Sequence, residues 1–198
     1  VLDFVCNFMK TIQTSFPTLA AAIGVPEVWL KREDLHHFGS HKGRSIPYMI
    51  DHYWHKEQKT TFVISSSGNA ALAAALYVHH HNENNPDKQI TLQILVGGKI
   101  PAEKLARLQT LTDARIALQQ VENPRQTAFQ IDARGEATLL RQSTNDLALP
   151  GYAELAKELA AIPNLQAIFI PTSSGTTAQG LAHAFEHLEQ KPQIHIVQ

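Results

Sequence analysis

The strand-to-helix pattern of this chain is plainest at Thr61-Phe62-Val63-Ile64-Ser65-Ser66-Ser67-Gly68-Asn69-Ala70. Its first four residues are β-branched or aromatic, which is typical of a buried strand. Residues 70–81, which follow, are rich in alanine and favour a helix. The small polar residues between them therefore form the turn where a strand ends and a helix begins.

The same alternation runs through most of the 198 residues. It predicts an α/β fold, with a parallel sheet covered by helices on both faces. Ligands of such sheets bind at the carboxyl ends of the strands, so we expect the chemistry in the strand-to-helix turns. The expected strands are residues 28–30, 61–64, 90–96, 115–118, 167–170 and 194–197, and the expected helices are residues 45–57, 70–81, 101–111, 124–134, 152–161 and 177–188.

The composition argues against several classes of protein. Lysine and arginine number 17 against 18 aspartate and glutamate residues, so the charge signature of a nucleic-acid binder is missing. No apolar run approaches the roughly 20 residues of a membrane span, so no membrane contact is expected. Cys6 is the only cysteine, which excludes an intrachain disulfide framework and fits the cytoplasm.

A second turn of the same kind is Ile170-Pro171-Thr172-Ser173-Ser174-Gly175-Thr176-Thr177. A helix N-terminus offers unpaired N–H groups and the positive end of the helix dipole, so it can hold a phosphate or a carboxylate. Glycine lets the backbone approach such an anion closely, and hydroxyl groups add donors. The alternative for each turn is simple capping, because Ser, Thr and Asn are preferred N-caps.

Lys42 stands in the third feature, the segment of residues 31–44, which leads into the helix expected from residue 45. Lys42 and Arg44 both precede this helix, and cations are disfavoured at a helix N-terminus, so an unmodified lysine there needs a partner or a reason. A lysine whose amine forms a Schiff base in an apolar site has such a reason. The alternative is a solvated lysine.

In their order and spacing along the chain, residues 31–44, 65–69 and 173–177 resemble the pyridoxal-phosphate enzymes of fold type II, the tryptophan-synthase-β-like family that includes threonine synthase, serine/threonine dehydratases and cysteine synthase. Residues 31–35 with Gly39-Ser40-His41-Lys42 resemble its K-x-E-x…G-S-x-K stretch, which implies that Lys42 forms the Schiff base with pyridoxal 5′-phosphate. Ser66-Ser67-Gly68-Asn69 resembles its S-x-G-N loop. That likeness implies that Asn69 contacts the cofactor ring and that Ser66, Ser67 and Gly68 receive the substrate carboxylate.

Ser173-Ser174-Gly175-Thr176-Thr177 resembles the family's G-S-G-G-T loop, which holds the cofactor phosphate, although Ser173 and Thr176 stand where the family has glycine. The resemblance covers nearly the whole chain and implies a two-lobed fold type II architecture. Residues 1–43 and 150–198 would form the larger, cofactor-binding lobe. Residues 44–149 would form a smaller, mobile lobe that carries the asparagine loop.

The resemblance further implies a lyase or synthase that performs α,β-elimination or β/γ-replacement on a small amino acid. His41 before Lys42 resembles tryptophan synthase β, whereas Ser66-Ser67-Gly68-Asn69 resembles serine/threonine dehydratases and threonine synthase, which we favour. Lys42 would take the α-proton while the cofactor stabilises the resulting carbanion. Family members are longer, so we expect the C-terminal part of the larger lobe to be absent, with the residue that faces the ring nitrogen. Many relatives are dimers, which makes a homodimer one expected assembly.

Other classes stay open. A truncated, non-catalytic remnant that acts as a binding or scaffold protein would fit the shortened lobe and the altered phosphate loop. A serine hydrolase could use the turn of residues 65–68, but this turn lacks the G-x-S-x-G motif of the nucleophile elbow. No metal site is expected, because His79-His80-His81 suits a helix C-terminus and because His52 and His55 suit a solvated helix face.

Overall fold

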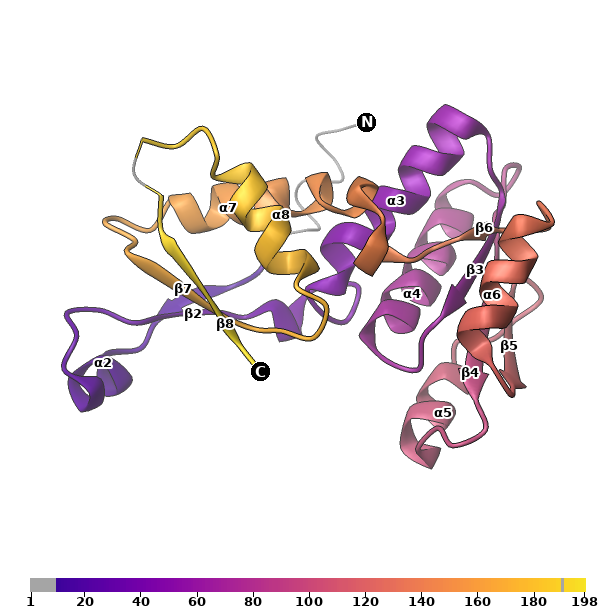
Figure 1. The fold of residues 1–198 in the computed structure, drawn as a ribbon, viewed down its shortest axis with the longest axis horizontal. Helices are drawn as coiled ribbons and strands as arrows, with labels where there is room; N and C mark the ends of the chain where they lie inside the picture. The colour runs from indigo at the N-terminus through magenta and orange to yellow at the C-terminus, as the bar shows by residue number, and fades with distance from the viewer. Residues whose placement is uncertain (1–9, 190) are drawn as a thin grey trace.

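The computed structural model describes residues 10–189 and 191–198, which fold into two lobes that one long helix and residues 140–149 connect (Figure 1). That helix is α3 (Lys42–Glu57), which runs from the middle of the molecule into the right-hand lobe of that view. Cys6 lies outside the described residues. Within the described part of the chain, no helix is both long enough and apolar enough to span a bilayer.

The right-hand lobe holds a four-stranded sheet in the order β5-β4-β3-β6, in which every neighbouring pair is parallel. Alternate side chains of β3 enter different cores, because Phe62 and Ile64 pack on the side of α3 and α4 while Val63 packs with Ala128 of α6. The predicted parallel sheet with helices on both faces is therefore confirmed. The elements are β3 (Thr61–Ser65), α4 (Asn69–Asn84), β4 (Thr91–Gly97), α5 (Ala102–Gln109), β5 (Ile116–Val121), α6 (Pro124–Ala133) and β6 (Thr138–Leu139).

The left-hand lobe is built on two small sheets. One pairs β1 (Gln13–Ser15) with β2 (Trp29–Lys31) in antiparallel fashion, and α2 (Pro17–Ile23) lies between them in sequence. The other pairs β7 with β8 in parallel and packs one face against α7 and α8. The remaining elements of this lobe are η1 (Glu33–Leu35), η4 (Pro150–Tyr152), α7 (Ala153–Ala160), β7 (Ala167–Pro171), α8 (Thr176–Ala184) and β8 (Gln193–Val197). Between β6 and η4 lie η2 (Gln142–Thr144) and η3 (Asp146–Ala148), and η3 packs through Ala148 on the core of the right-hand lobe.

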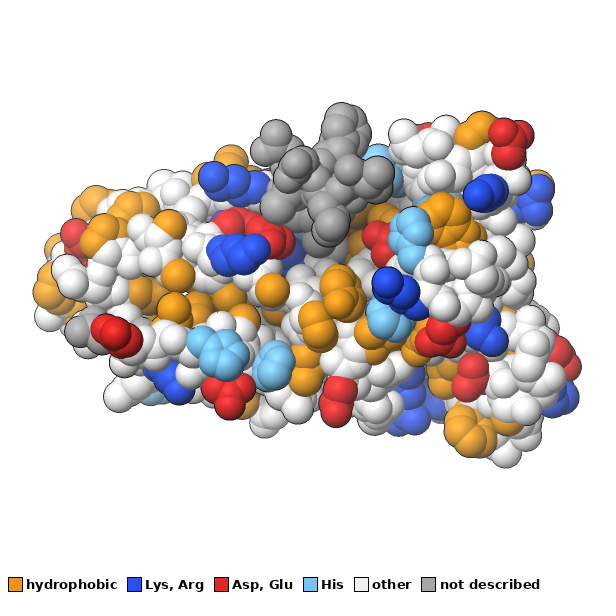
Figure 2. Space-filling view, turned by 90° about the horizontal axis from the view of Figure 1, so that it is seen from above, with side chains coloured by type: hydrophobic (Ala, Val, Ile, Leu, Met, Phe, Trp, Pro, Cys, Tyr) orange, Lys and Arg blue, Asp and Glu red, His pale blue; other side chains and the backbone are white. Residues whose placement is uncertain are grey.

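The surface carries charges of both signs. On the face shown in Figure 2, lysine and arginine side chains lie interspersed with aspartate and glutamate, as the near-zero net charge leads one to expect. The outer face of the β7–β8 sheet is partly apolar, since Phe169 is 68% exposed and stacks on His195 with ring centroids 4.6 Å apart.

Three expected helix boundaries are wrong by three or four residues. Helix α8 ends at Ala184 rather than at residue 188. Helix α3 begins at Lys42 rather than at residue 45, because Gly43 lets the first turn pass directly over the His36 ring. A Cβ atom on Gly43 would lie 2.4 Å from that ring. Helix α4 continues to Asn84, so the three histidines lie inside its last turns rather than at its end. His81 is buried there, with Nε2 3.3 Å from the carbonyl oxygen of Lys88.

Candidate active site

Lys42 is the first residue of α3, and its side chain is half-buried. The loop before it lies against α4, since a Cβ atom on Gly39 would lie 2.5 Å from Leu72 Cδ2. Gly39 has a φ of 80°, a conformation that favours glycine. The backbone N–H of Lys42 donates to Ser40 Oγ over 3.2 Å. Burial lowers the pKa of the Lys42 amine, which favours the neutral, nucleophilic form.

The serine-rich turn lies between β3 and α4, as the sequence predicts. Asn69 is the first residue of α4 and is exposed, while Ser66, Ser67 and Gly68 are half-buried. The backbone N–H of Gly68 donates to Ser66 Oγ over 3.2 Å, which shapes the turn. No atom lies within 4 Å of the place where a Cβ atom on Gly68 would stand, so the backbone there is open to a ligand.

The second turn lies between β7 and α8, where Gly175 precedes the helix with a φ of 79°. No atom lies within 4 Å of the position of a Cβ atom on Gly175. Thr176 is the first residue of α8 and is buried, and its Oγ1 lies 2.9 Å from Ser174 Oγ. Ser173 and Ser174 are exposed. The hydroxyls therefore surround an accessible stretch of backbone.

All three helices that carry predicted site residues begin without a side-chain cap. The N-cap residues are His41 for α3, Gly68 for α4 and Gly175 for α8, and none of them caps its helix with a side-chain hydrogen bond. The N-cap side chains of these two turns thus form no hydrogen bond to their helices, and the same holds for the other α-helices of the described chain. The first N–H groups of α4 and α8 remain available to an anion.

A buried tyrosine joins the phosphate-loop helix to the lysine helix. Thr177 Oγ1 donates to the hydroxyl of Tyr152 over 3.2 Å, and the same hydroxyl lies 3.2 Å from Ser45 Oγ. Tyr152 is fully buried. The turn before α3 meanwhile packs on α4 through Gly39. The structure thus connects the three predicted segments through α3, and among the described residues no hydrogen bond joins Lys42 directly to Asn69 or to the second turn.

Two hollows lie at opposite ends of the strands of this sheet. One of about 560 Å³ opens at the carboxyl ends of the strands and takes in the serine-rich turn, but not Lys42 or Asn69. It is lined by Ser65, Ser66, Ser67, Gly68, Leu95, Val96, Gly97, Asn123, Pro124, Arg125 and Gln126. The other, of about 610 Å³, opens near Trp54 and Arg115 and contains no predicted site residue.

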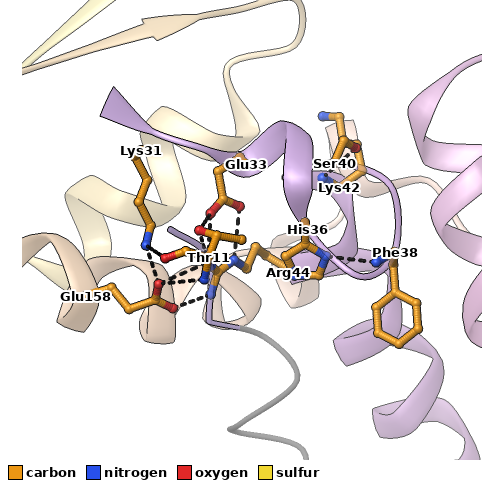
Figure 3. Close-up of polar contacts among 9 residues, drawn as sticks. All are labelled: Thr11, Lys31, Glu33, His36, Phe38, Ser40, Lys42, Arg44 and Glu158. Carbon is orange, nitrogen blue, oxygen red and sulfur yellow. Dashed lines mark hydrogen bonds and ion pairs between the residues drawn. The ribbon is translucent and has the colours of Figure 1, made fainter. Parts of the chain in front are cut away.

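Beside Lys42 lies a buried cluster of charges, which Figure 3 shows. The Arg44 side chain is fully buried and forms a two-pronged pair with Glu33, with Nη2–Oε1 2.7 Å and Nε–Oε2 3.0 Å. Its Nη1 donates to Glu158 Oε1 over 2.6 Å. Lys31 pairs with the other oxygen of Glu158 and donates to the carbonyl oxygen of Thr11 over 2.8 Å. Two carboxylates thus offset two cations.

The cluster sets the protonation of its members. Burial raises the pKa of Glu33, but the hydrogen bonds and charge of Arg44 lower it by more, so the net pKa of Glu33 lies below its ordinary value. Glu158 follows the same pattern, with Lys31 as a second cation. His36 lies beside this cluster, and its burial, followed by the charge of Arg44, lowers its pKa to about 4. His36 is therefore neutral at pH 7.

Sequence reasoning found some members of this cluster but not the cluster. The segment of residues 31–35 and Arg44 stood out because cations precede a helix there, and Arg44 proves to be neutralised by distant carboxylates. Glu158 lies in α7, far along the chain, and no local pattern marks it. The only available signal was that Arg44 is a cation close to a helix N-terminus, where cations are disfavoured.

A family model described as pyridoxal-phosphate dependent enzyme matches residues 10–198. The chain belongs to this family. Its cofactor is pyridoxal 5′-phosphate, and the resemblance seen in the sequence is confirmed. No curated protein matches the chain.

Solved structures of this family share the fold type II architecture. A pyridoxal 5′-phosphate-dependent aspartate racemase superposes with a TM-score of 0.79 at 19% identity, covering 94% of this chain and 56% of the racemase. Maize serine racemase gives 0.79 at 20% identity, with coverages of 95% and 55%. The processed form of threonine deaminase isoform 2 from Solanum lycopersicum gives 0.78 at 20%, with coverages of 94% and 50%. The chain spans about half the length of these structures.

The residues present fit the family's cofactor. Two uncapped helix N-termini offer backbone donors for anionic groups, and the open space at Gly175 admits a phosphate close to the backbone. Hydroxyls of Ser174 and Thr176 lie beside that space. Lys42 supplies a half-buried amine with a lowered pKa, as a carbonyl-binding lysine requires.

Proposed function

We propose that this chain carries the cofactor-binding part of a pyridoxal-phosphate-dependent lyase or synthase that acts on a small amino acid. The observation that supports this most directly is the placement of Lys42, Asn69 and Thr176. Each is the first residue of an uncapped helix, and α3 connects the three. An amine and two helix N-termini that can hold anions are what a lysine-bound phosphate cofactor and a carboxylate substrate require.

Each predicted residue has a defined task in this proposal. The N–H groups and hydroxyls at Ser66, Ser67 and Gly68 bind the substrate carboxylate, and residues 173–177 bind the cofactor phosphate. Asn69 contacts the cofactor ring. Lys42 Nζ holds the cofactor and, once released, accepts the α-proton of the substrate. When bound, the cofactor delocalises the negative charge left on the α-carbon.

We propose α,β-elimination or β/γ-replacement as the reaction, in the manner of a serine/threonine dehydratase or threonine synthase. The likeness to a threonine deaminase supports elimination, and the likeness to two racemases supports removal of an α-proton. We also propose that residues 44–149 form the mobile lobe and that residues 1–43 and 150–198 belong to the larger one.

The first test is the visible absorption spectrum of the purified chain with added pyridoxal phosphate, followed by borohydride reduction and peptide mapping. We expect a yellow protein with the adduct on Lys42, and a colourless Lys42→Ala variant. Lys59→Ala, which removes an exposed lysine, is the matched control and should stay yellow. A colourless native chain would favour the alternative, a non-catalytic remnant. A yellow chain would next be tested for keto acid and ammonia production from serine and threonine.

A further inference from the structure

We propose that Arg44 is a positioning residue for Lys42. Its buried guanidinium ties the first turn of α3 to the left-hand lobe and thereby fixes where the Lys42 amine stands. This inference rests on the proposed function, because it concerns the reaction of Lys42 with the cofactor. Arg44 itself faces Glu33 and Glu158, and Lys42 lies away from these carboxylates in Figure 3.

The geometry of Arg44 is that of an anchor. Its three nitrogen atoms donate to both oxygens of Glu33, to both oxygens of Glu158 and to Thr11 Oγ1, at 2.6 to 3.3 Å. Such a fork fixes the orientation of a planar guanidinium as well as its position. Since the side chain is fully buried, water does not compete for these donors.

The partners of Arg44 come from separate segments of one lobe. Thr11 precedes β1, Glu33 lies in η1 and Glu158 lies in α7. Beyond its first turn, α3 runs into the other lobe and packs against α4. The helix thus has one end tied to the left-hand lobe. Lys42 lies two positions before Arg44, on the tied end, so a shift of the other lobe leaves its backbone in place.

Only an arginine satisfies both carboxylates at once. A lysine at position 44 would keep the charge but would lose the planar fork that reaches two carboxylates. An apolar residue would leave Glu33 and Glu158 with Lys31 as the remaining cation of the cluster. In either case the first turn of α3 loses orientation, and near-attack geometry at the Lys42 amine is lost with it.

The test separates binding of the cofactor from its reaction with Lys42. The probe for binding is 4′-deoxypyridoxine 5′-phosphate, which keeps the ring and the phosphate but has no aldehyde. The probe for reaction is pyridoxal phosphate. The Lys42 nitrogen bonds to its aldehyde carbon with loss of one water, and borohydride then adds hydride to the carbon–nitrogen double bond. The trapped adduct is quantified by peptide mapping as a function of time.

We expect Arg44→Met to lower the trapping rate at Lys42 by about tenfold or more while its affinity for the deoxy analogue stays unchanged. Arg44→Lys should restore part of the rate. Glu158→Gln, which keeps an acceptor for Arg44, should lower the rate less than Arg44→Met does. It also provides a second test if Arg44→Met fails to fold. Arg32→Met is the matched control, because Arg32 pairs with Asp34 on the surface of the same segment.

Three outcomes would overturn the inference. In the first, Arg44→Met, or Glu158→Gln if that variant must replace it, traps pyridoxal phosphate as fast as the native chain. In the second, trapping and analogue affinity fall in parallel, which would show a merely structural role. In the third, the native chain forms no adduct on Lys42, and then the proposed function fails as well. The third outcome is measured on the native chain alone, whereas the first two are measured on the variants. Failure of the proposed function is therefore distinguishable from failure of this inference.

Discussion

Thr177 donates a hydrogen bond of 3.2 Å to the hydroxyl of Tyr152, and this contact ties the start of α8 to the lysine helix. The same hydroxyl lies 3.2 Å from Ser45 Oγ, one turn into α3, and accepts a longer bond of 3.4 Å from Gln142. One buried phenol thus links the predicted phosphate loop to the helix that begins at Lys42. The link passes through the interior, so water cannot replace it.

Tyr152→Phe should therefore destabilise the protein although it removes a single oxygen. The loss leaves the buried hydroxyl of Ser45 and the half-buried hydroxyl of Thr177 without their partner, which costs about 1–3 kcal/mol. Urea unfolding measures the change. Tyr48→Phe is the matched control, because Tyr48 is 38% exposed, and it should change the free energy of unfolding by less than about 0.5 kcal/mol. Equal stabilities of the two variants would contradict the role of Tyr152.

Gly151→Ala should also destabilise the protein, for a steric reason. A Cβ atom on Gly151 would lie 2.6 Å from the carbonyl oxygen of Arg44 and 2.8 Å from Ser45 Cα. Both are backbone atoms of α3, which cannot rotate away, so we expect a loss of about 1–3 kcal/mol. Gly98→Ala is the control, since no atom lies within 4 Å of the added carbon. Thermal unfolding of both variants decides the point, and a stable Gly151→Ala would contradict the close packing of η4 on α3.

Sequence periodicity predicted the parallel sheet because β3, β4 and β5 each present a continuous apolar run. It missed β1 and β6, which have three and two residues and are too short to show a pattern. Those strands form because neighbouring strands offer them backbone partners, as Val63 does for Leu139. Such pairing is decided by tertiary structure and not by local propensity.

The candidate site likewise has features that the local sequence predicts and features that depend on distant contacts. The turns that carry Asn69 and Thr176 are local features, and a strand followed by small polar residues and a helix marks them. The pairing of Arg44 with Glu158 is a contact between positions 114 residues apart, so no local sequence pattern predicts it. The early start of α3 depends on the close approach of Gly43 to the His36 ring, which is a tertiary contact that periodicity does not reveal.

His36 should make the protein less stable in acid. Its pKa is about 4 in the folded state, because of burial and then the charge of Arg44, and about 6.5 when unfolded. Between these values the unfolded chain binds the proton and the folded chain does not, so stability is complete above pH 6.5 and falls as the pH approaches 4. The loss attributable to this group is about 3 kcal/mol.

The variant His36→Asn isolates this contribution, because its side-chain oxygen can still accept the Phe38 N–H that Nδ1 accepts at 3.1 Å. Urea unfolding at a series of pH values should show a shallower fall for His36→Asn than for the native chain. His187→Asn changes an exposed histidine and should keep the native slope. A slope for His36→Asn equal to that of the native chain would show that other groups, such as the similarly shifted His41, carry the acid sensitivity.

Lys42 should react as a nucleophile at a lower pH than an exposed lysine does, even without cofactor. Burial disfavours the charged ammonium and lowers its pKa, so the free amine appears at a pH below the ordinary midpoint of about 10.4. Limited acetylation with dilute acetic anhydride over a pH series, read by peptide mass spectrometry, measures the midpoint for Lys42. Peptides that contain exposed Lys59 serve as the internal reference for the reagent. A Lys42 curve that superposes on the reference would show that the first turn of α3 is hydrated. The amine would then have no advantage at neutral pH as the group that captures the cofactor.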